Sequence, residues 1–207
     1  MENILEKLVV LALFLGIGFP VHEFSHALVA YWRGDATAKM MGRLTLNPVA
    51  HFDPMGGIFM ALTLLTSGFA WGWAKPTPVN TVNLRNRKND EVLVALAGPA
   101  SNFLLAVAGA LIIRVLVALG VQPPLFVANV FVMFLLSNLI LAIFNFVPVP
   151  PLDGGSLLYR FLSPRQAWQI RPILAQYGML IVLAVGLLGG QLIYGIALRV
   201  AAFLVGA

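Results

Sequence analysis

The chain has 207 residues, of which 60% are apolar and 10% are charged, and its mean hydropathy is +0.91. Soluble domains carry about 25% charged residues, so this chain lacks the polar surface that a soluble globular fold needs. Intrinsic disorder is excluded as well, because it requires low hydrophobicity. The composition therefore predicts an all-α polytopic membrane protein, a single integral-membrane domain over residues 1–207 with a bundle of about four to six transmembrane helices.

The net charge of +5 and the isoelectric point near 10 would also be compatible with nucleic-acid binding. However, the basic residues lie between the apolar segments, where the positive-inside rule places them, so we expect the lipid bilayer and no nucleic acid as a partner. The chain has no cysteine, which excludes disulfides and thiolate chemistry but leaves the redox compartment open.

The first predicted span covers residues 8–32 and is interrupted only by His22, Glu23 and His26. At 1.5 Å per residue, a helix over this range is about 37 Å long, which is enough for a bilayer core of about 30 Å. Pro20 is expected to kink this helix just before the histidines. The segment does not resemble a cleaved signal peptide, because a positively charged N-terminal region and a cleavage site of small residues are both missing.

Further apolar segments follow along the chain. Residues 54–74 are uncharged but rich in glycine, whereas residues 92–119 and 125–146 are predicted spans separated by a short turn. The last segment, residues 172–198, is also uncharged and predicts either one long span or, together with the tail, a shorter hairpin of two.

The basic residues predict the orientation of these spans. Ten of the thirteen lie in three loops, at residues 33–53, 75–91 and 160–171, and the turn at 120–124 has none. The positive-inside rule places all three basic loops in the cytoplasm. This arrangement requires residues 54–74 to dip into the membrane and return as a re-entrant segment, which is tolerated only where the backbone is buried in protein or lines a wet cavity. If this segment crosses instead, one basic loop lies outside. Residues 39–46, between the first span and this segment, are predicted to form a short β-like strand or ribbon that could hold an unwound substrate by strand addition, or else an ordinary amphipathic connector.

Residues 22–26, His-Glu-Phe-Ser-His, carry the strongest chemical signal. On a helix, residues i and i+4 lie about 40° apart around the axis and 6 Å apart along it, so the imidazoles of His22 and His26 point the same way and can reach one zinc ion. Glu23 lies about 100° further around, where it can take a proton from an activated water. The alternative, two satisfied histidines and a buried glutamate without function, is costly because each ionisable group at membrane depth is penalised by about 2.5 kcal/mol or more.

A catalytic zinc ion needs a third protein ligand and an open position. Asp153 is the best candidate among few acidic residues, because it follows 38 residues without a charge and lies at the cytoplasmic end of its predicted span, at the same depth as His22 and His26. The prolines before it stop the helix, and the glycines after it allow a close turn. Asp153 could instead, or in addition, cap the next helix.

Three motifs together resemble the site-2 protease family of intramembrane zinc metalloproteases: residues 22–26, the Gly-Pro-x-x-Asn segment at 97–102, and the run from Asn to Gly at 145–155. Residues 46–54 and 72–76 are similar to the compact bacterial and archaeal branch of that family, and the likeness covers nearly the whole chain. Many members of the family carry a PDZ domain or a pair of CBS domains, for which this chain has no room.

The resemblance implies that His22, His26 and Asp153 bind one zinc ion per chain and that Glu23 is the catalytic base. It also implies that Asn145 binds the substrate backbone near the scissile bond. On this basis the protein is expected to be a zinc metalloendopeptidase of the HExxH type in the cell (cytoplasmic) membrane. Its expected substrates are transmembrane proteins, cleaved within the bilayer by an active site that opens toward the cytoplasm.

The resemblance leaves His51 and Asn102 open. His51 could donate to a developing oxyanion or bind metal, or it could only pair with a backbone group, since Asn-Pro at 47–48 and Asp-Pro at 53–54 are turn formers. Asn102 could contact the substrate, or it could hydrogen-bond between helices that Gly98 allows to approach closely.

A non-proteolytic transporter or metal-permeation protein is the alternative function, because intramembrane histidines and carboxylates also suit ion pathways. Glu23 discriminates between the two, since it is not one of the expected zinc ligands. A transporter should tolerate Glu23→Gln, whereas a protease should lose nearly all turnover.

Overall fold

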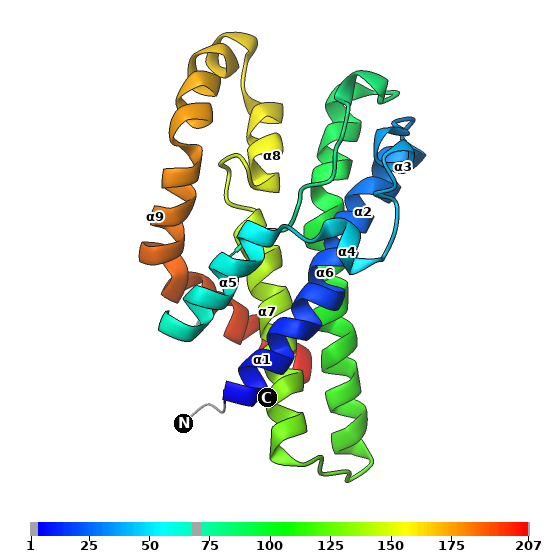
Figure 1. The fold of residues 1–207 in the computed structure, drawn as a ribbon, viewed down its shortest axis with the longest axis vertical. Helices are drawn as coiled ribbons and strands as arrows, with labels where there is room; N and C mark the ends of the chain where they lie inside the picture. The colour runs from blue at the N-terminus through cyan, green and yellow to red at the C-terminus, as the bar shows by residue number, and fades with distance from the viewer. Residues whose placement is uncertain (1–3, 68–71, 207) are drawn as a thin grey trace.

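The computed structural model of the protein describes residues 4–67 and 72–206, and all regular structure within these ranges is helical. The elements follow one another as drawn in Figure 1. In chain order they are α1 (Ile4–Leu13), the π-helical turn η1 (Phe14–Gly18), α2 (Phe19–Trp32), α3 (Thr37–Met40), α4 (Pro48–His51), α5 (Pro54–Ser67), the 3-10 turn η2 (Thr81–Asn83), α6 (Arg87–Ala118), α7 (Leu125–Asn145), α8 (Asp153–Phe161) and α9 (Pro164–Val205).

Within the described ranges, four stretches of helix are long and apolar enough to cross a membrane: residues 4–32, α6, α7 and α9. This number confirms the predicted bundle of four to six helices, and the first three lie close to the ranges expected from the sequence. The fourth, α9, is one continuous helix of 42 residues rather than a hairpin of two. Figure 1 shows that α9 changes direction along its length, so that its second half turns toward α7.

The prediction of a strand over residues 39–46 is wrong: the helix α3 ends at Met40, and turns follow it, with no strand among the described residues. The segment expected to be re-entrant begins as the helix α5. Fourteen residues of helix are about 21 Å long, which is less than the bilayer core of about 30 Å. Because α5 alone is too short to cross, its length supports the re-entrant interpretation. Residues 68–71 lie outside the described ranges, but the chain that follows them returns to the start of α5: the Phe59 and Trp73 rings lie 5.6 Å apart, and the N–H of Lys75 donates to the carbonyl group of His51 (2.9 Å).

The π-helical turn η1 lies directly before Pro20, where the sequence predicts a kink. Proline has no N–H to donate, and in a regular helix its ring collides with the carbonyl group four residues earlier. The wider π turn accommodates this ring, and such turns are frequent at functional sites. Here the turn ends four residues before His22, the first histidine of the motif.

Small and branched apolar side chains hold the bundle together where α6, α7 and α9 cross. The largest buried cluster consists of Ala106, Ala110, Leu135, Leu136, Leu139, Ala197 and Ala201. Alanine side chains let helix backbones approach closely, so this cluster fixes α6 against α7. A second cluster of Phe14, Phe19 and Met60 packs η1 and the start of α2 against α5. The first cluster thus fixes α6, α7 and α9 to one another, and the second fixes the start of α2 to α5.

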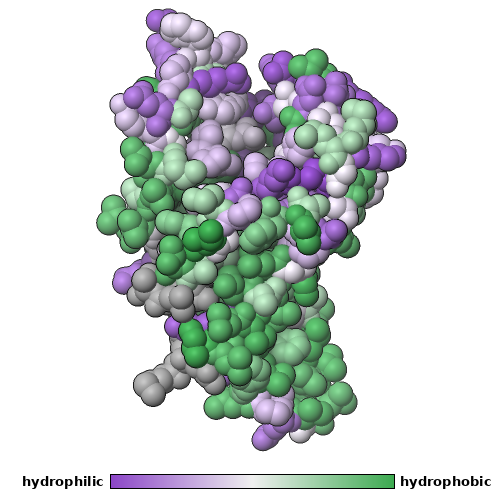
Figure 2. Space-filling view, in the orientation of Figure 1, coloured by the Kyte–Doolittle hydropathy of each residue, from purple (hydrophilic) through white to green (hydrophobic). Residues whose placement is uncertain are grey.

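Hydrophilic side chains gather at the end of the molecule that carries α3, the start of α6 and the junction of α8 and α9 (Figure 2). This end is hollowed between α8 and α9 on one side and α2 and α6 on the other, whereas apolar side chains cover the opposite part. Parts of all three basic loops lie at the hydrophilic end. Their common location supports the orientation that the positive-inside rule predicts.

Asp35 ties the chain that follows α2 to the chain that precedes α6. Its side chain is 0% exposed and accepts hydrogen bonds from the main-chain N–H groups of Thr37 (3.0 Å) and Asn80 (2.7 Å) and from the Asn83 side chain (3.0 Å). Burial alone would raise the pKa of Asp35, but hydrogen bonds, led by those from the Thr37 and Asn83 side chains, outweigh it and lower the pKa below its ordinary value. The ionised carboxylate therefore stabilises this junction.

We expect Asp35→Asn to lower the free energy of unfolding at neutral pH by about 1–3 kcal/mol, because an amide cannot accept all the hydrogen bonds that the buried carboxylate accepts. A group whose pKa is lowered by folding contributes its stability above its ordinary pKa, about 3.9, and loses it as the pH falls through the folded-state value. The difference between wild type and variant, measured by thermal unfolding in detergent micelles, should therefore shrink below about pH 4. A difference that stays constant under acid conditions would contradict this assignment.

Candidate metal centre

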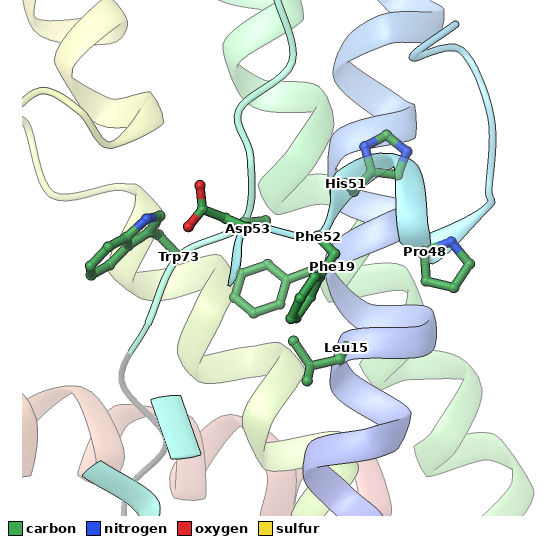
Figure 3. A pocket seen from close by; sticks show the side chains of 8 residues that line it. Leu15, Phe19, Pro48, His51, Phe52, Asp53 and Trp73 are labelled. Carbon is green, nitrogen blue, oxygen red and sulfur yellow. The ribbon is translucent and has the colours of Figure 1, made fainter. Parts of the chain in front are cut away.

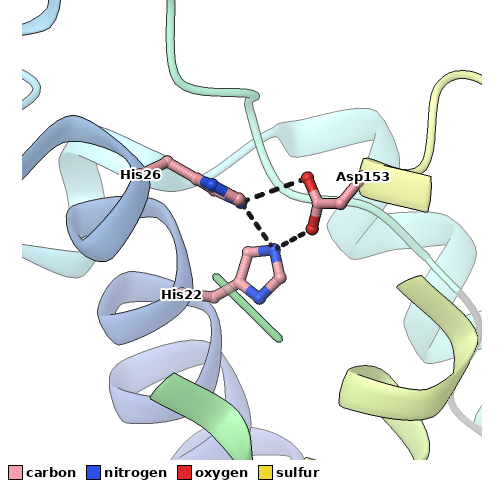
Figure 4. A group of neighbouring side chains, drawn as sticks. All are labelled: His22, His26 and Asp153. Atoms are coloured by element: carbon pink, nitrogen blue, oxygen red, sulfur yellow. Dashed lines mark hydrogen bonds and ion pairs between the residues drawn. The ribbon is translucent and has the colours of Figure 1, made fainter. Parts of the chain in front are cut away.

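Three side chains from two distant parts of the chain converge on one point (Figure 4). The Nε2 atoms of His22 and His26 lie 3.1 Å apart, and each lies 3.3 Å from one oxygen of the Asp153 carboxylate. Both histidines are buried and Asp153 is half-buried. The structure thus brings together the three residues that the sequence nominates as metal ligands.

Local structure explains how these residues meet. Helix α2 presents both histidines on one face because they are four residues apart. The carboxylate arrives from the other half of the chain: α7 ends at Asn145, the chain turns through residues 146–152, and α8 begins at Asp153. Glycine is required next, because a Cβ atom at Gly154 would lie 2.6 Å from the carbonyl oxygen of Phe146. Close packing of this turn against the start of α8 carries the carboxylate to the histidines.

The Nδ1 atom of each histidine donates a hydrogen bond to an acceptor on α6. His26 Nδ1 donates to the carbonyl oxygen of Val94 on α6 (2.7 Å), and His22 Nδ1 donates to Oδ1 of Asn102 (2.6 Å). With both Nδ1 atoms protonated, both Nε2 atoms present lone pairs to each other and to the carboxylate. Three electron-rich groups at this separation repel one another unless a cation lies between them.

This set of donor atoms fits a zinc ion. Zinc takes imidazole nitrogen and carboxylate oxygen at about 2.0–2.1 Å in a tetrahedron, whose edges are then about 3.3–3.4 Å long. The observed separations of 3.1 and 3.3 Å match such edges. In addition, Oδ2 of Asp153 is buried and has no hydrogen-bond donor among the described residues, as expected of an atom that binds metal. Three protein ligands leave one position open, which is typical of catalytic rather than structural zinc sites.

Gly98 on α6 closes one side of this cluster. A Cβ atom at this position would lie 2.6 Å from Nε2 of His22 and closer still to Nε2 of His26. The backbone of α6 can approach the imidazoles only because this residue has no side chain. The space that both Nε2 atoms face is therefore available to an ion only when residue 98 is glycine.

Glu23 is held by the extended stretch of residues 72–80. The main-chain N–H of Thr77 donates to Oε2 of Glu23 (2.7 Å), and the Thr77 hydroxyl donates to the Glu23 carbonyl group (2.9 Å). The stretch is fixed two residues earlier, where the N–H of Lys75 donates to the carbonyl group of His51 (2.9 Å). The main chain of residues 72–80 thus fixes the orientation of one carboxylate oxygen of Glu23.

Asn145 and Asn102 occupy different surroundings. Asn145, the last residue of α7, donates from Nδ2 to the carbonyl group of Leu141, and no hydrogen bond within the described ranges joins it to the metal cluster. Asn102 is 0% exposed, and its Nδ2 donates to the carbonyl group of Gly18 (3.2 Å) and to Oδ1 of Asn138 (2.8 Å). Because both of its amide protons are used inside the protein, Asn102 has none for a substrate oxygen. The structure favours the interhelical role over the substrate-binding one.

His51 lies at the end of α4, beside a small pocket between α2, α4 and the chain that follows α5 (Figure 3). Its Nε2 donates to the carbonyl group of Thr45 (2.7 Å), and its buried Nδ1 has no partner among the residues that the structure describes. The one ring N–H that has an acceptor among the described residues is thus used within the protein. Asp53, on the same pocket, accepts from the N–H of Gly56 (2.8 Å) and so caps α5, as expected of a turn former.

Three contributors to the site are not expected from the sequence. Thr77 acts through its main-chain N–H, which no side-chain motif reveals. Gly98 is expected only to let helices approach, whereas it faces the metal cluster itself. Asn138, the partner of Asn102, is a polar residue within an apolar span, and this isolated polarity is the signal that could have indicated it.

Comparisons with known proteins provide independent evidence on the family of this chain. The family model described as "Peptidase family M50" matches residues 122–186. The chain is 40% identical over 158 residues to the Bacillus subtilis protein named "Putative zinc metalloprotease YwhC", a match that covers 74% of this chain and 69% of that protein. The Mycolicibacterium smegmatis protein named "Putative zinc metalloprotease Rip2" is 30% identical over 165 residues, a match that covers 78% of this chain and 60% of that protein. Rip2 of Mycobacterium tuberculosis is 29% identical over 152 residues, a match that covers 73% of this chain and 57% of that protein. No solved structure matches the chain.

Proposed function

We propose that this chain, which belongs to peptidase family M50, the site-2 protease family of zinc metalloproteases, cleaves transmembrane segments of membrane proteins within the bilayer. The observation that carries this proposal is the meeting of two imidazoles and one carboxylate in a bundle of membrane-length helices. Ionisable groups in such a bundle are costly, so they are rare and mark functional sites. The four apolar helices and the family membership make the protein a multi-pass membrane protein.

In this proposal His22, His26 and Asp153 hold one zinc ion, and Glu23 is the general base. A bound zinc ion supplies a Lewis acid that polarises a peptide carbonyl group and lowers the pKa of water. Glu23 accepts a proton from the attacking water at Oε1 while the N–H of Thr77 holds Oε2. Glu23 then passes this proton to the nitrogen of the leaving amine, so that the C–N bond breaks and the carboxylate is restored.

Asn145 and His51 are proposed to contact the substrate. Asn145 ends α7 directly before the turn that delivers Asp153, which supports a role for its side-chain amide in binding a substrate main chain next to the metal. Nδ1 of His51 has no partner among the described residues, and with the ring proton on Nε2 it can accept a hydrogen bond from a substrate N–H.

The active site is proposed to open toward the cytoplasm. The hollow at the hydrophilic end of the molecule lies between the helices that carry the two halves of the metal cluster (Figure 2). The basic loops at this end support its cytoplasmic location. Water for hydrolysis would enter through the same hollow.

Metal removal tests the proposal on the purified protein in lipid vesicles that also contain a transmembrane peptide. We expect a chelator to abolish cleavage and one equivalent of Zn²⁺ per chain to restore it, because the protein groups alone provide no Lewis acid. Mass spectrometry of the products should place the cut inside the apolar segment of the peptide. Mg²⁺ is the control ion: it prefers oxygen ligands and should not restore cleavage.

Two results would overturn different parts of this proposal. Cleavage that persists after complete metal removal would exclude zinc-dependent catalysis. A cut found only outside the apolar segment would exclude intramembrane cleavage while leaving the metalloprotease assignment in place.

A further inference from the structure

We infer that Asn138 is a positioning residue for the metal centre: acting through Asn102, it holds the His22 imidazole with its Nε2 lone pair directed at the metal. This inference rests on the proposed zinc site. Asn138 lies on α7 and Asn102 on α6, and both are 0% exposed. Amide groups buried between apolar helices are unfavourable unless their donors and acceptors are paired. The presence of two such amides between α6 and α7 therefore needs an explanation.

Two main-chain carbonyl groups determine how the two amides are oriented. Asn138 Nδ2 lies 2.9 Å from the carbonyl oxygen of Phe134, which can only accept, so the Oδ1 atom of Asn138 faces Asn102. Asn102 Nδ2 donates to this Oδ1 (2.8 Å) and to the carbonyl oxygen of Gly18 (3.2 Å). Rotating either amide by half a turn would bring two oxygen atoms together. The fold therefore sets the direction of every hydrogen bond in the relay.

The relay ends at the metal cluster. Asn102 has one oxygen left, and it accepts from Nδ1 of His22 at 2.6 Å. The proton of His22 is therefore on Nδ1, and the lone pair on Nε2 is free for a metal. His26 needs no such relay, because its Nδ1 donates directly to the main-chain carbonyl group of Val94 (2.7 Å). One histidine is thus oriented by the main chain and the other by two asparagines that connect α2, α6 and α7.

Asn138 has a distinct part in this arrangement. Without it, one amide proton of Asn102 would have no acceptor in an apolar interior. Asn102 would reduce this loss by tilting away from its present position, and its 2.6 Å hydrogen bond to His22 would weaken. The orientation of His22 thus depends on a residue that touches neither metal nor substrate.

Zinc affinity measures this effect directly. Asn138→Leu removes the acceptor and keeps a side chain of similar size. In micelles, competition with a chromophoric chelator should show Zn²⁺ binding weakened about tenfold, at the lower end of the roughly 10–100-fold seen when outer hydrogen bonds of metal ligands are lost. Asn102→Leu should weaken binding by as much or more. Because Asn138 acts through Asn102, the double variant should bind Zn²⁺ no more weakly than Asn102→Leu alone.

Two further variants separate positioning from packing. Ser137→Ala is the matched control, because the Ser137 hydroxyl donates to the carbonyl group of Met133 on the same helix (2.8 Å) and takes no part in the relay. It should bind Zn²⁺ like the wild type. Asn138→Asp, with a neutral carboxyl group, keeps a donor for Phe134 and an acceptor for Asn102, so it should retain most of the wild-type affinity. Co²⁺ in place of Zn²⁺ should show shifted absorption bands in Asn138→Leu but not in Ser137→Ala.

Wild-type Zn²⁺ affinity in Asn138→Leu would overturn the inference. Fully additive losses in the double variant would overturn it as well, and so would equal losses in Asn138→Leu and Asn138→Asp. None of these results affects the proposed function, which is tested on the wild type by metal removal and by the position of the cut.

Discussion

Glu23→Gln is expected to bind zinc as the wild type does and to cleave about 10²–10⁴-fold more slowly. Glutamine has the same size as glutamate and keeps an oxygen that can accept the N–H of Thr77, which lies 2.7 Å from Oε2 of Glu23. It cannot take a proton from water at neutral pH, so the step assigned to the base is lost. Since the three proposed ligands are unchanged, the zinc content should not fall.

Zinc content and cleavage of a transmembrane peptide should be measured on the same preparation. Glu6→Gln is the matched control, because Glu6 is another buried glutamate of the first span, to which Asn129 donates (3.1 Å). It lies about 24 Å from His22 along the helix axis, so cleavage should be unchanged. Wild-type cleavage by Glu23→Gln would remove Glu23 as the base. Loss of zinc together with cleavage would instead assign Glu23 to metal binding. A wild type that binds zinc but cleaves nothing would favour the metal-permeation alternative.

The residues of the metal cluster could be predicted from two features of the sequence. These are the spacing of the histidines along one helix and the positions of the basic loops between the spans. A spacing of four on a helix is sufficient to place His22 and His26 on one face. Asp153 lies far away in sequence, but the basic loops fix the direction of each span and so bring its end of α7 to the same depth as the histidines. The structure has these three residues in contact.

The hydrogen bonds that orient the cluster could not be predicted in this way. Thr77 contributes only a main-chain N–H, so its side chain gives no signal. Asn138 meets Asn102 because α6 packs against α7 in one particular register, which apolar sequences of this kind do not reveal. Pro20 predicts a disturbance in the first span, but a kink and a π turn relieve the same clash, and only the structure distinguishes them.

Gly98→Ala is expected to abolish zinc binding by filling the space that the ion needs. The added Cβ atom would lie 2.6 Å from Nε2 of His22 and closer still to Nε2 of His26, and real Cβ atoms essentially never approach other atoms within 3.0 Å. Neither ring can move aside easily, because Asn102 holds one Nδ1 and Val94 holds the other. We expect the Zn²⁺ affinity to fall by more than the roughly 10–100-fold that the loss of an outer hydrogen bond costs.

The same substitution elsewhere on α6 separates this steric effect from a general effect on the helix. A Cβ atom at Gly109 meets only ordinary contacts, the nearest being Leu135 Cβ at 3.8 Å, so Gly109→Ala should bind zinc normally. Alanine is a better helix former than glycine by about 1 kcal/mol, so this control should not lower the unfolding temperature. Gly98→Ala should lose metal and cleavage together, whereas Glu23→Gln should lose cleavage alone. Wild-type zinc affinity in Gly98→Ala, with helicity confirmed by circular dichroism, would mean that the ion binds outside the space between the two Nε2 atoms.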